Sequence, residues 1–163
     1  MKIAILSDQH GSLPSIPECD MVILSGDLCG GPAHIGGKWR PDVSDADCRR
    51  WLENEFAEWI RKVPQAIAIA GNHDTGIEHF GFPDLPNVVY LQDSGCELLG
   101  LKFWGTPWIR RFDNLAFNDD DSGLAIHWSA IPNDIDVLVC HMPPRIGGFS
   151  IDKLRHADVA LRV

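Results

Sequence analysis

Ile3-Ala4-Ile5-Leu6-Ser7-Asp8-Gln9-His10 begins the chain with a short apolar run that leads directly into an aspartate and a histidine. Three later stretches repeat this pattern: residues 21–24 precede Gly26-Asp27, residues 66–69 precede Gly71-Asn72-His73-Asp74, and residues 137–139 precede Cys140-His141. Short apolar runs bounded by glycine or polar residues are typical of buried strands. Ligands of open α/β sheets bind beyond the carboxyl ends of the strands. The sequence therefore predicts one crevice to which all four strand ends contribute.

The side chains at these strand ends carry the donor atoms of a metal site. They are Asp8, His10, Asp27, Asn72, His73 and His141. Oxygen and imidazole donors together suit Mn, Fe, Zn or Ni better than Ca or a thiolate-bound metal. Each residue alone also fits an ordinary turn or cap. Six of them at four consecutive strand ends favour a site.

Composition indicates one soluble domain and narrows the choice of partners. The chain has 163 residues, which is within the usual length of a single domain, so we expect one domain over residues 1–163. A net charge of -9 and a pI near 5.1 make a nucleic-acid polymer or an anionic membrane a poor partner. Five scattered cysteines without a CxxC pair indicate reduced intracellular thiols. With no signal peptide or membrane-spanning run in the sequence, we expect a cytoplasmic protein.

The segment after residue 43 has the pattern of an amphipathic helix. Ser44 and Asp47 have the spacing of a capping box, in a variant with aspartate at the third position. Apolar residues then recur at spacings of three and four until Pro64, which cannot continue a helix. The sequence predicts a helix that packs its apolar stripe on a sheet.

The rest of the chain alternates strands with helices. A hairpin is expected over residues 96–99 and 101–104, and a short helix that reaches Trp128 is expected after the acidic run 119–122. The glycine-rich stretch 28–43 is expected to be irregular, and residues 151–163 to form a helix. This alternation predicts an α/β fold.

The order of the polar clusters resembles that of the calcineurin-like metallophosphoesterases. The family's order of motifs is also the order found here: Asp-x-His, Gly-Asp, Gly-Asn-His-Asp and a lone histidine after a strand. Two further stretches look like parts of the family's small phosphodiesterase branch: Gly105-Thr106-Pro107-Trp108 and His141-Met142-Pro143-Pro144. The resemblance covers nearly the whole chain. It implies a sandwich of two mixed sheets flanked by helices, and a hydrolase acting on small phosphate esters, with phosphodiesters as the expected substrates.

The resemblance also implies a role for each site residue. One metal ion would take Asp8, His10 and Asp27, and a second would take Asp27, Asn72 and His141, with Mn as the expected metal and Fe, Zn or Ni as alternatives. A hydroxide bridging the two metals would attack phosphorus in line with the leaving oxygen. His73 would stabilise the transition state or protonate the leaving group, and Asp74 would orient His73.

One family motif has no counterpart in the sequence. Family members carry a Gly-His-x-His motif whose two histidines each bind one metal ion, and the 163 residues contain none. We therefore expect weaker metal binding than in the family, and an exposed sheet edge through which two copies of the chain could pair as a homo-oligomer. The alternative function is a catalytically impaired phosphoesterase-fold protein that binds a metal or a partner.

Overall fold

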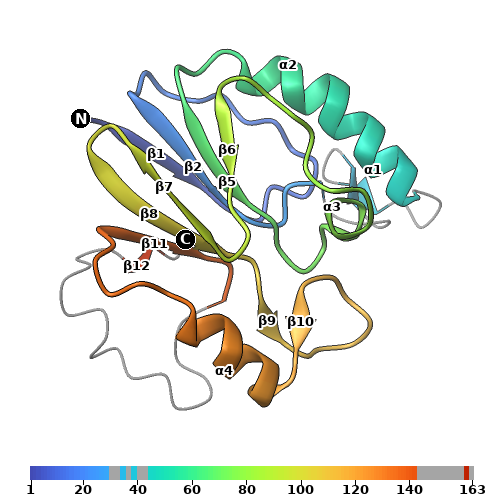
Figure 1. Ribbon diagram of the computed structural model, residues 1–163. Coiled ribbons are helices and arrows are strands. Elements are labelled where there is room, and N and C mark those ends of the chain that lie inside the picture. The colour runs from blue at the N-terminus through green and yellow to red at the C-terminus, as the bar shows by residue number, and fades with distance from the viewer. Residues whose placement is uncertain (30–33, 36–37, 40–43, 143–159, 162–163) are drawn as a thin grey trace.

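The computed structural model describes residues 1–29, 34–35, 38–39, 44–142 and 160–161, and it has a mixed α/β architecture (Figure 1). The strands are β1 (Ile3–Leu6), β2 (Met21–Ser25), β3 (His34–Ile35), β4 (Lys38–Trp39), β5 (Ala66–Ile69), β6 (Val88–Tyr90), β7 (Ser94–Leu98), β8 (Leu101–Thr106), β9 (Ile109–Arg110), β10 (Asn118–Asp119), β11 (Val137–Cys140) and β12 (Ala160–Leu161). The helices are α1 (Asp45–Trp51), a π-helical turn η2 (Leu52–Phe56), α2 (Ala57–Ile60), α3 (Thr75–Phe80) and α4 (Asp121–Ser129).

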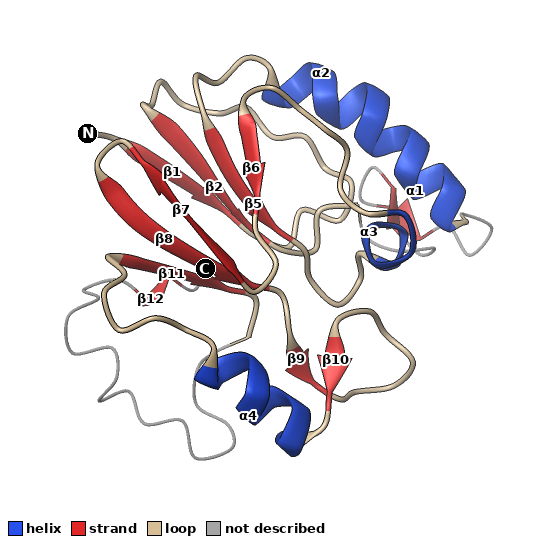
Figure 2. Ribbon diagram, viewed as in Figure 1, coloured by secondary structure: helices blue, strands red, loops and turns tan. Residues whose placement is uncertain are grey.

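Two four-stranded sheets face each other and are covered by helices on their outer sides (Figure 2). The first sheet has the order β1-β2-β5-β6, and its described strands are all parallel. The second has the order β12-β11-β8-β7 and is mixed, because the β7–β8 hairpin is antiparallel while β11 runs parallel to β8 and β12. Helices α1 and α2 lie over the first sheet and α4 lies under the second. The predicted α/β fold class is confirmed, but only the second sheet is mixed; the described strands of the first are all parallel.

The apolar runs of the central strands are continuous because both faces of each strand are buried. In β2, Met21 and Ile23 pack between the two sheets, whereas Val22 and Leu24 pack toward α1 and α2. A third apolar cluster, around Trp128, fills the space between α4 and the second sheet. The layers therefore have the order helix, sheet, sheet, helix, and the strand ends lie at the edges of this sandwich.

The predicted capping box begins the first helix. The Ser44 hydroxyl accepts a hydrogen bond from the Asp47 amide at 3.3 Å, and the Asp47 carboxylate accepts from the Ser44 amide at 2.9 Å. Helical backbone then continues from α1 through η2 to Ile60. Cys48 and Phe56 are fully buried within the stripe that faces the sheet.

Two sequence predictions about local structure were wrong in part. Ala160–Leu161 form the strand β12, which pairs in parallel with β11, so the helix expected over residues 151–163 does not include them. At these two residues, pairing with the buried strand β11 outweighed the local preference for a helix. The rest of the segment 151–163 lies outside the described residues. In the stretch expected to be irregular, β3 and β4 pair antiparallel with two residues between them, which is the spacing of a tight hairpin.

The α3 helix was not predicted, because its sequence is polar and contains Gly76. The glycine allows a close approach to α1: a Cβ atom at residue 76 would lie 2.9 Å from the Asp45 carbonyl oxygen and 2.9 Å from the Cys48 Cβ. Tertiary packing therefore explains this short helix better than local propensity does.

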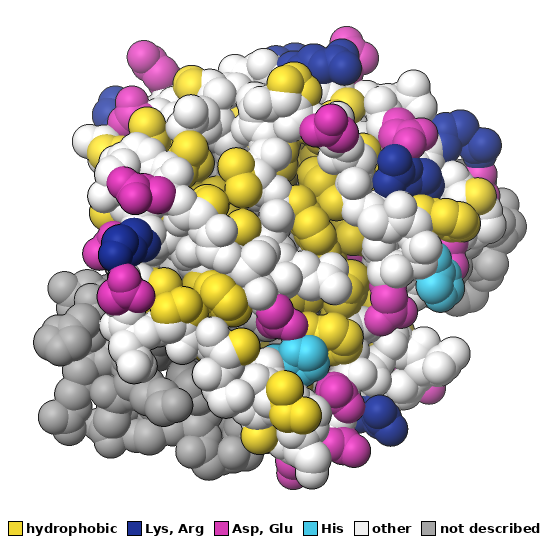
Figure 3. Space-filling view, viewed as in Figure 1, with side chains coloured by type: hydrophobic (Ala, Val, Ile, Leu, Met, Phe, Trp, Pro, Cys, Tyr) yellow, Lys and Arg dark blue, Asp and Glu magenta, His cyan; other side chains and the backbone are white. Residues whose placement is uncertain are grey.

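No helix within the described residues is long and apolar enough to cross a membrane. Among the described strands, β1 lies at the edge of its sheet. On the face shown in Figure 3, acidic side chains are interspersed with lysines and arginines that stand singly or in small groups. Single-domain organisation, cytoplasmic location and pairing between copies stay predictions.

Candidate metal centre

The loops after β1 and β2 run side by side and deliver the first three site residues. The amides of Asp8 and His10 donate to the carbonyl oxygens of Gly26 and Asp27 at 3.0 and 2.9 Å. Asp8, His10 and Asp27 all have positive φ, at 52°, 45° and 54°. Aspartate and histidine tolerate this region better than most residues do. Backbone strain of this kind tends to occur at functional sites, where the surrounding structure holds it in place.

The loops after β5 and β11 complete the cluster around Asp27. His141 Nε2 lies 3.3 Å from Asp27 Oδ1 and 3.1 Å from Asn72 Oδ1. His10 Nε2 lies 3.7 Å from the other oxygen of Asp27, Oδ2. The two oxygens of the Asp27 carboxylate thus face two different histidines.

The donor set fits a divalent cation. Donor atoms of Asp8, Asp27 and His141 lie within 4.8 Å of one another. The side chains of Asp27 and His141 are only 4% and 7% exposed, whereas Asp8 is exposed, so the cluster connects the interior with solvent. Two carboxylates with imidazole and amide donors match the chemistry of Mn, Fe, Zn or Ni.

The ring of His141 is held by the backbone on the side away from Asp27. Its Nδ1 lies 2.9 Å from the Ser25 carbonyl oxygen, which fixes the ring plane and leaves Nε2 directed at Asp27 and Asn72. A hydrogen bond from the far nitrogen is the usual support of a metal-binding histidine. Sequence reasoning missed Ser25, because a backbone carbonyl has no side-chain signature.

Asp27 and His141 form a buried acid–base pair. Burial disfavours the charged form of Asp27, but the hydrogen bond and charge of His141 outweigh it and lower the Asp27 pKa. Burial likewise opposes protonation of His141, yet the hydrogen bond and charge of Asp27 raise the His141 pKa to about 9. A bound cation could replace the proton of this pair, because metal ligands must be deprotonated.

His73 contacts both sides of the cluster. Its backbone amide donates to Asp27 Oδ1 at 2.8 Å. Its ring meets the ring of His10 edge to face, with 5.0 Å between the ring centroids. The structure therefore brings His73 beside the expected ligands.

Asp74 is fully buried. Its carboxylate accepts hydrogen bonds from the amides of Gly71, Leu28 and Cys29 and from the Cys29 thiol. Burial, and next the charge of Asp27, raise the pKa of Asp74, and the backbone hydrogen bonds oppose that rise. Its partners are the two neighbouring loops, whereas the family resemblance predicts the His73 ring as its partner. A catalytic role for His73 and Asp74 stays a prediction.

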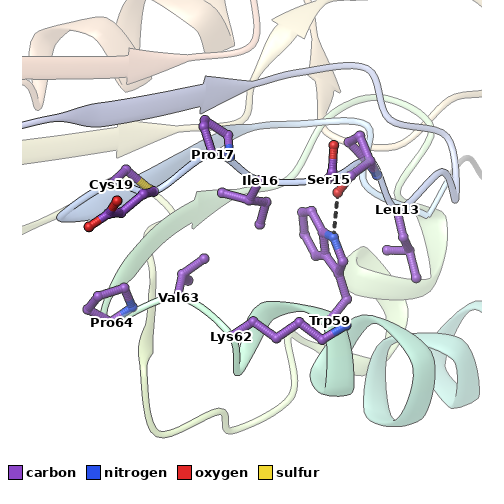
Figure 4. A pocket seen from close by; sticks show the side chains of 11 residues that line it. Leu13, Ser15, Ile16, Pro17, Cys19, Trp59, Lys62, Val63 and Pro64 are labelled. Atoms are coloured by element: carbon purple, nitrogen blue, oxygen red, sulfur yellow. Dashed lines mark hydrogen bonds between the residues drawn. The ribbon is translucent and has the colours of Figure 1, made fainter.

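A groove of about 700 Å³ opens elsewhere on the molecule, between residues 13–19 and the end of the α2 helix (Figure 4). The indole nitrogen of Trp59 donates to the Pro14 carbonyl oxygen at 2.8 Å and ties the two sides of the groove together. None of the expected metal ligands lines it. The groove is therefore separate from the cluster around Asp27.

Comparison with known proteins agrees with the geometry. The family model of calcineurin-like phosphoesterases matches residues 1–162. The UPF0046 proteins T07D4.2 and K07C11.7 of Caenorhabditis elegans are 30% and 28% identical to the chain, over 83% and 88% of it. Human metallophosphoesterase domain-containing protein 1 is 29% identical over 55% of the chain. These matches span 40%, 51% and 36% of the relatives' own lengths, so the chain corresponds to about half of each or less.

Proposed function

The chain belongs to the calcineurin-like phosphoesterase family, and on that premise we propose that it hydrolyses small phosphodiesters with two divalent metal ions, Mn being the first choice. The proposal rests mainly on one observation, the two-sided environment of Asp27. Its Oδ1 faces His141 and its Oδ2 faces His10, at 3.3 and 3.7 Å. A carboxylate in this position suits a ligand shared by two cations.

The expected ligands can be assigned to the two sides of Asp27 as follows. His10 faces one oxygen of Asp27, and His141, which contacts Asn72, faces the other. Asp8 lies close to both Asp27 and His141, and we assign it to the ion held by His10. Bound divalent ions supply a hydroxide at neutral pH and positive charge for the developing phosphoryl oxyanion. The carbonyl oxygen of Asn72 donates to a cation without adding negative charge, which keeps the centre more electrophilic than another carboxylate would.

His73 is the proposed proton donor. Its amide is anchored on Asp27 and its ring packs against His10, so the ring stands beside the ligands without replacing one. Protonation of the departing ester oxygen by a positioned histidine is typical general acid catalysis. The hydroxide would form a new P–O bond as the ester P–O bond breaks, and the proton from His73 would leave with the alcohol.

Charge favours small diesters as substrates. A phosphodiester carries one negative charge where a monoester carries about two near neutral pH. The chain carries a net charge of -9, which disfavours the more charged substrate and also disfavours a nucleic-acid polymer.

The direct test is hydrolysis of bis(4-nitrophenyl) phosphate compared with 4-nitrophenyl phosphate, each with added Mn²⁺ and with a chelator. We expect Mn-dependent release of nitrophenolate, faster from the diester. The matched control is Asp27→Asn, which keeps the size of the side chain but removes its charge, and it should be inactive. Turnover that survives the chelator or the Asp27→Asn change would contradict the proposal. Metal binding without turnover would favour the alternative of an impaired metal-binding protein.

A further inference from the structure

The buried carboxylate of Asp74 is saturated by hydrogen bonds. Oδ2 accepts from the Gly71 amide at 2.8 Å and from the Leu28 amide at 3.1 Å. Oδ1 accepts from the Cys29 amide at 2.9 Å and from the Cys29 thiol at 3.2 Å. A carboxylate has about four acceptor positions, and these four donors fill them. No acceptor position is left for the His73 ring.

The donors belong to the two loops that carry the central metal ligands. Leu28 and Cys29 directly follow Asp27, and Gly71 directly precedes Asn72. The same two loops are also joined by a bond in which the donor and acceptor loops are exchanged: the amide of His73, beside Asp74, donates to Asp27 Oδ1. Each loop thus contributes one carboxylate that holds the backbone of the other.

We propose that Asp74 is a positioning residue that fixes the Asp27 loop against the Asn72 loop, with the Cys29 thiol as its fourth donor, and thereby sets the affinity of the site for metal. This inference rests on the proposed metal-binding function. Neither Asp74 nor Cys29 touches metal or substrate in this account. Partners that orient metal ligands in this way typically change metal affinity by about 10- to 100-fold when they are mutated.

Asp74→Asn is the principal test, because it keeps the shape of the side chain but replaces one acceptor oxygen with an amide group that faces N–H donors. Mn²⁺ binding is measured by titration calorimetry. We expect the Kd to rise at least about 10-fold. At saturating Mn²⁺ the kcat should fall much less than in His73→Ala. The opposite pattern, with an unchanged Kd and a kcat as low as that of His73→Ala, would restore the His73-orienting role and overturn the proposal.

Cys29 provides a milder pair of variants. Cys29→Ala removes one of the four donors and should raise the Kd for Mn²⁺ severalfold, whereas Cys29→Ser restores an O–H donor and should return the Kd toward that of the unmodified chain. Equal effects of alanine and serine would count against the thiol contact. If Asp74→Asn does not fold, this pair carries the test.

Amide hydrogen exchange on the metal-free chain separates this inference from the proposed function. We call the hydrogen bonds of the Asp74 carboxylate to the two loops the Asp74 clamp. Its loss should speed exchange of the amides of Leu28, Cys29 and Gly71 by about 10-fold or more, while amides of the β7–β8 hairpin keep their protection. Failure of the unmodified chain to bind Mn²⁺ would refute the metal function and leave the clamp to be judged by exchange. Unchanged exchange at all three amides in Asp74→Asn would refute the clamp.

Discussion

Gly71→Ala is the substitution whose effect on the metal centre follows most directly from the structure. A Cβ atom at residue 71 would lie 2.3 Å from Asp27 Oδ1, 2.5 Å from the Asp27 backbone nitrogen and 2.8 Å from His141 Nε2. Ordinary contact begins at 3.4 Å, so the Asp27 oxygen must move by about 1 Å. Gly71 does not have a positive φ, so alanine adds only bulk there.

The displaced atom is a proposed shared metal ligand, so a local steric change becomes a functional one. A misplacement of about 1 Å at a catalytic centre can cost about 100-fold in rate. Overpacking of this kind also costs about 1–3 kcal/mol of stability. Because the Asp27 backbone must shift as well, we expect a clear loss of thermal stability, together with a disproportionate loss of Mn²⁺ binding and phosphodiesterase activity.

Gly105→Ala is the matched control. A Cβ atom at residue 105 would lie 2.4 Å from the Leu91 Cβ and 2.8 Å from the Ile69 Cγ2, so it overpacks the space between the sheets instead of the ligands. Thermal melts, Mn²⁺ titrations and hydrolysis of bis(4-nitrophenyl) phosphate are compared for both variants. Both should lose stability, and only Gly71→Ala should lose metal affinity. Equal Mn²⁺ affinity in Gly71→Ala and the unmodified chain would refute the reasoning.

Three further predictions concern catalysis, a helix cap and an ionisation. His73→Ala should reduce turnover by about 100-fold or more while elemental analysis finds the metal content unchanged, as expected for a proton donor that is not a ligand; surviving turnover would rule out that role. Ser44→Ala removes the cap bonded to the Asp47 amide, so it should cost about 1 kcal/mol and lower the Tm by about 2–4 °C in a thermal melt; an unchanged Tm would show that the cap is dispensable. Burial, and next the charges of Asp74 and Asp93, raise the pKa of Tyr90, the chain's one tyrosine, so absorbance at the phenolate band should titrate above the usual value of about 10. Because its pKa is raised on folding, Tyr90 contributes stability below its unfolded pKa, and this contribution is lost as the pH rises further. Phenolate formation in the folded chain at about pH 10, the model-peptide value, would contradict this prediction.

The strands and most of the expected ligands could be predicted because their signals are local. Residues 66–69 form an apolar run bounded by polar residues, and its register places Gly71 and Asn72 just beyond the strand end. His141 follows β11 in the same way. These two strands belong to different sheets, and the packing of one sheet on the other brings their loops together, with 3.1 Å between His141 Nε2 and Asn72 Oδ1.

The parts that were not predicted depend on contacts between distant segments. The sequence around Asp74 does not show whether this residue holds neighbouring loops or orients His73. The hydrogen bonds that it accepts from Leu28 and Cys29 join residues more than forty positions apart in the chain. The α3 helix depends on the fit of Gly76 against α1. The β12 strand depends on pairing with β11. Local propensity contains no information about any of these contacts.

Metal stoichiometry tests the central claim most directly. The purified chain is dialysed to equilibrium against saturating Mn²⁺ and analysed for bound metal, beside the Asp27→Asn variant as a control. The account predicts close to two Mn ions per chain and a large loss in the control, because Asp27 faces donors on both sides. Close to zero metal in the unmodified chain would contradict it.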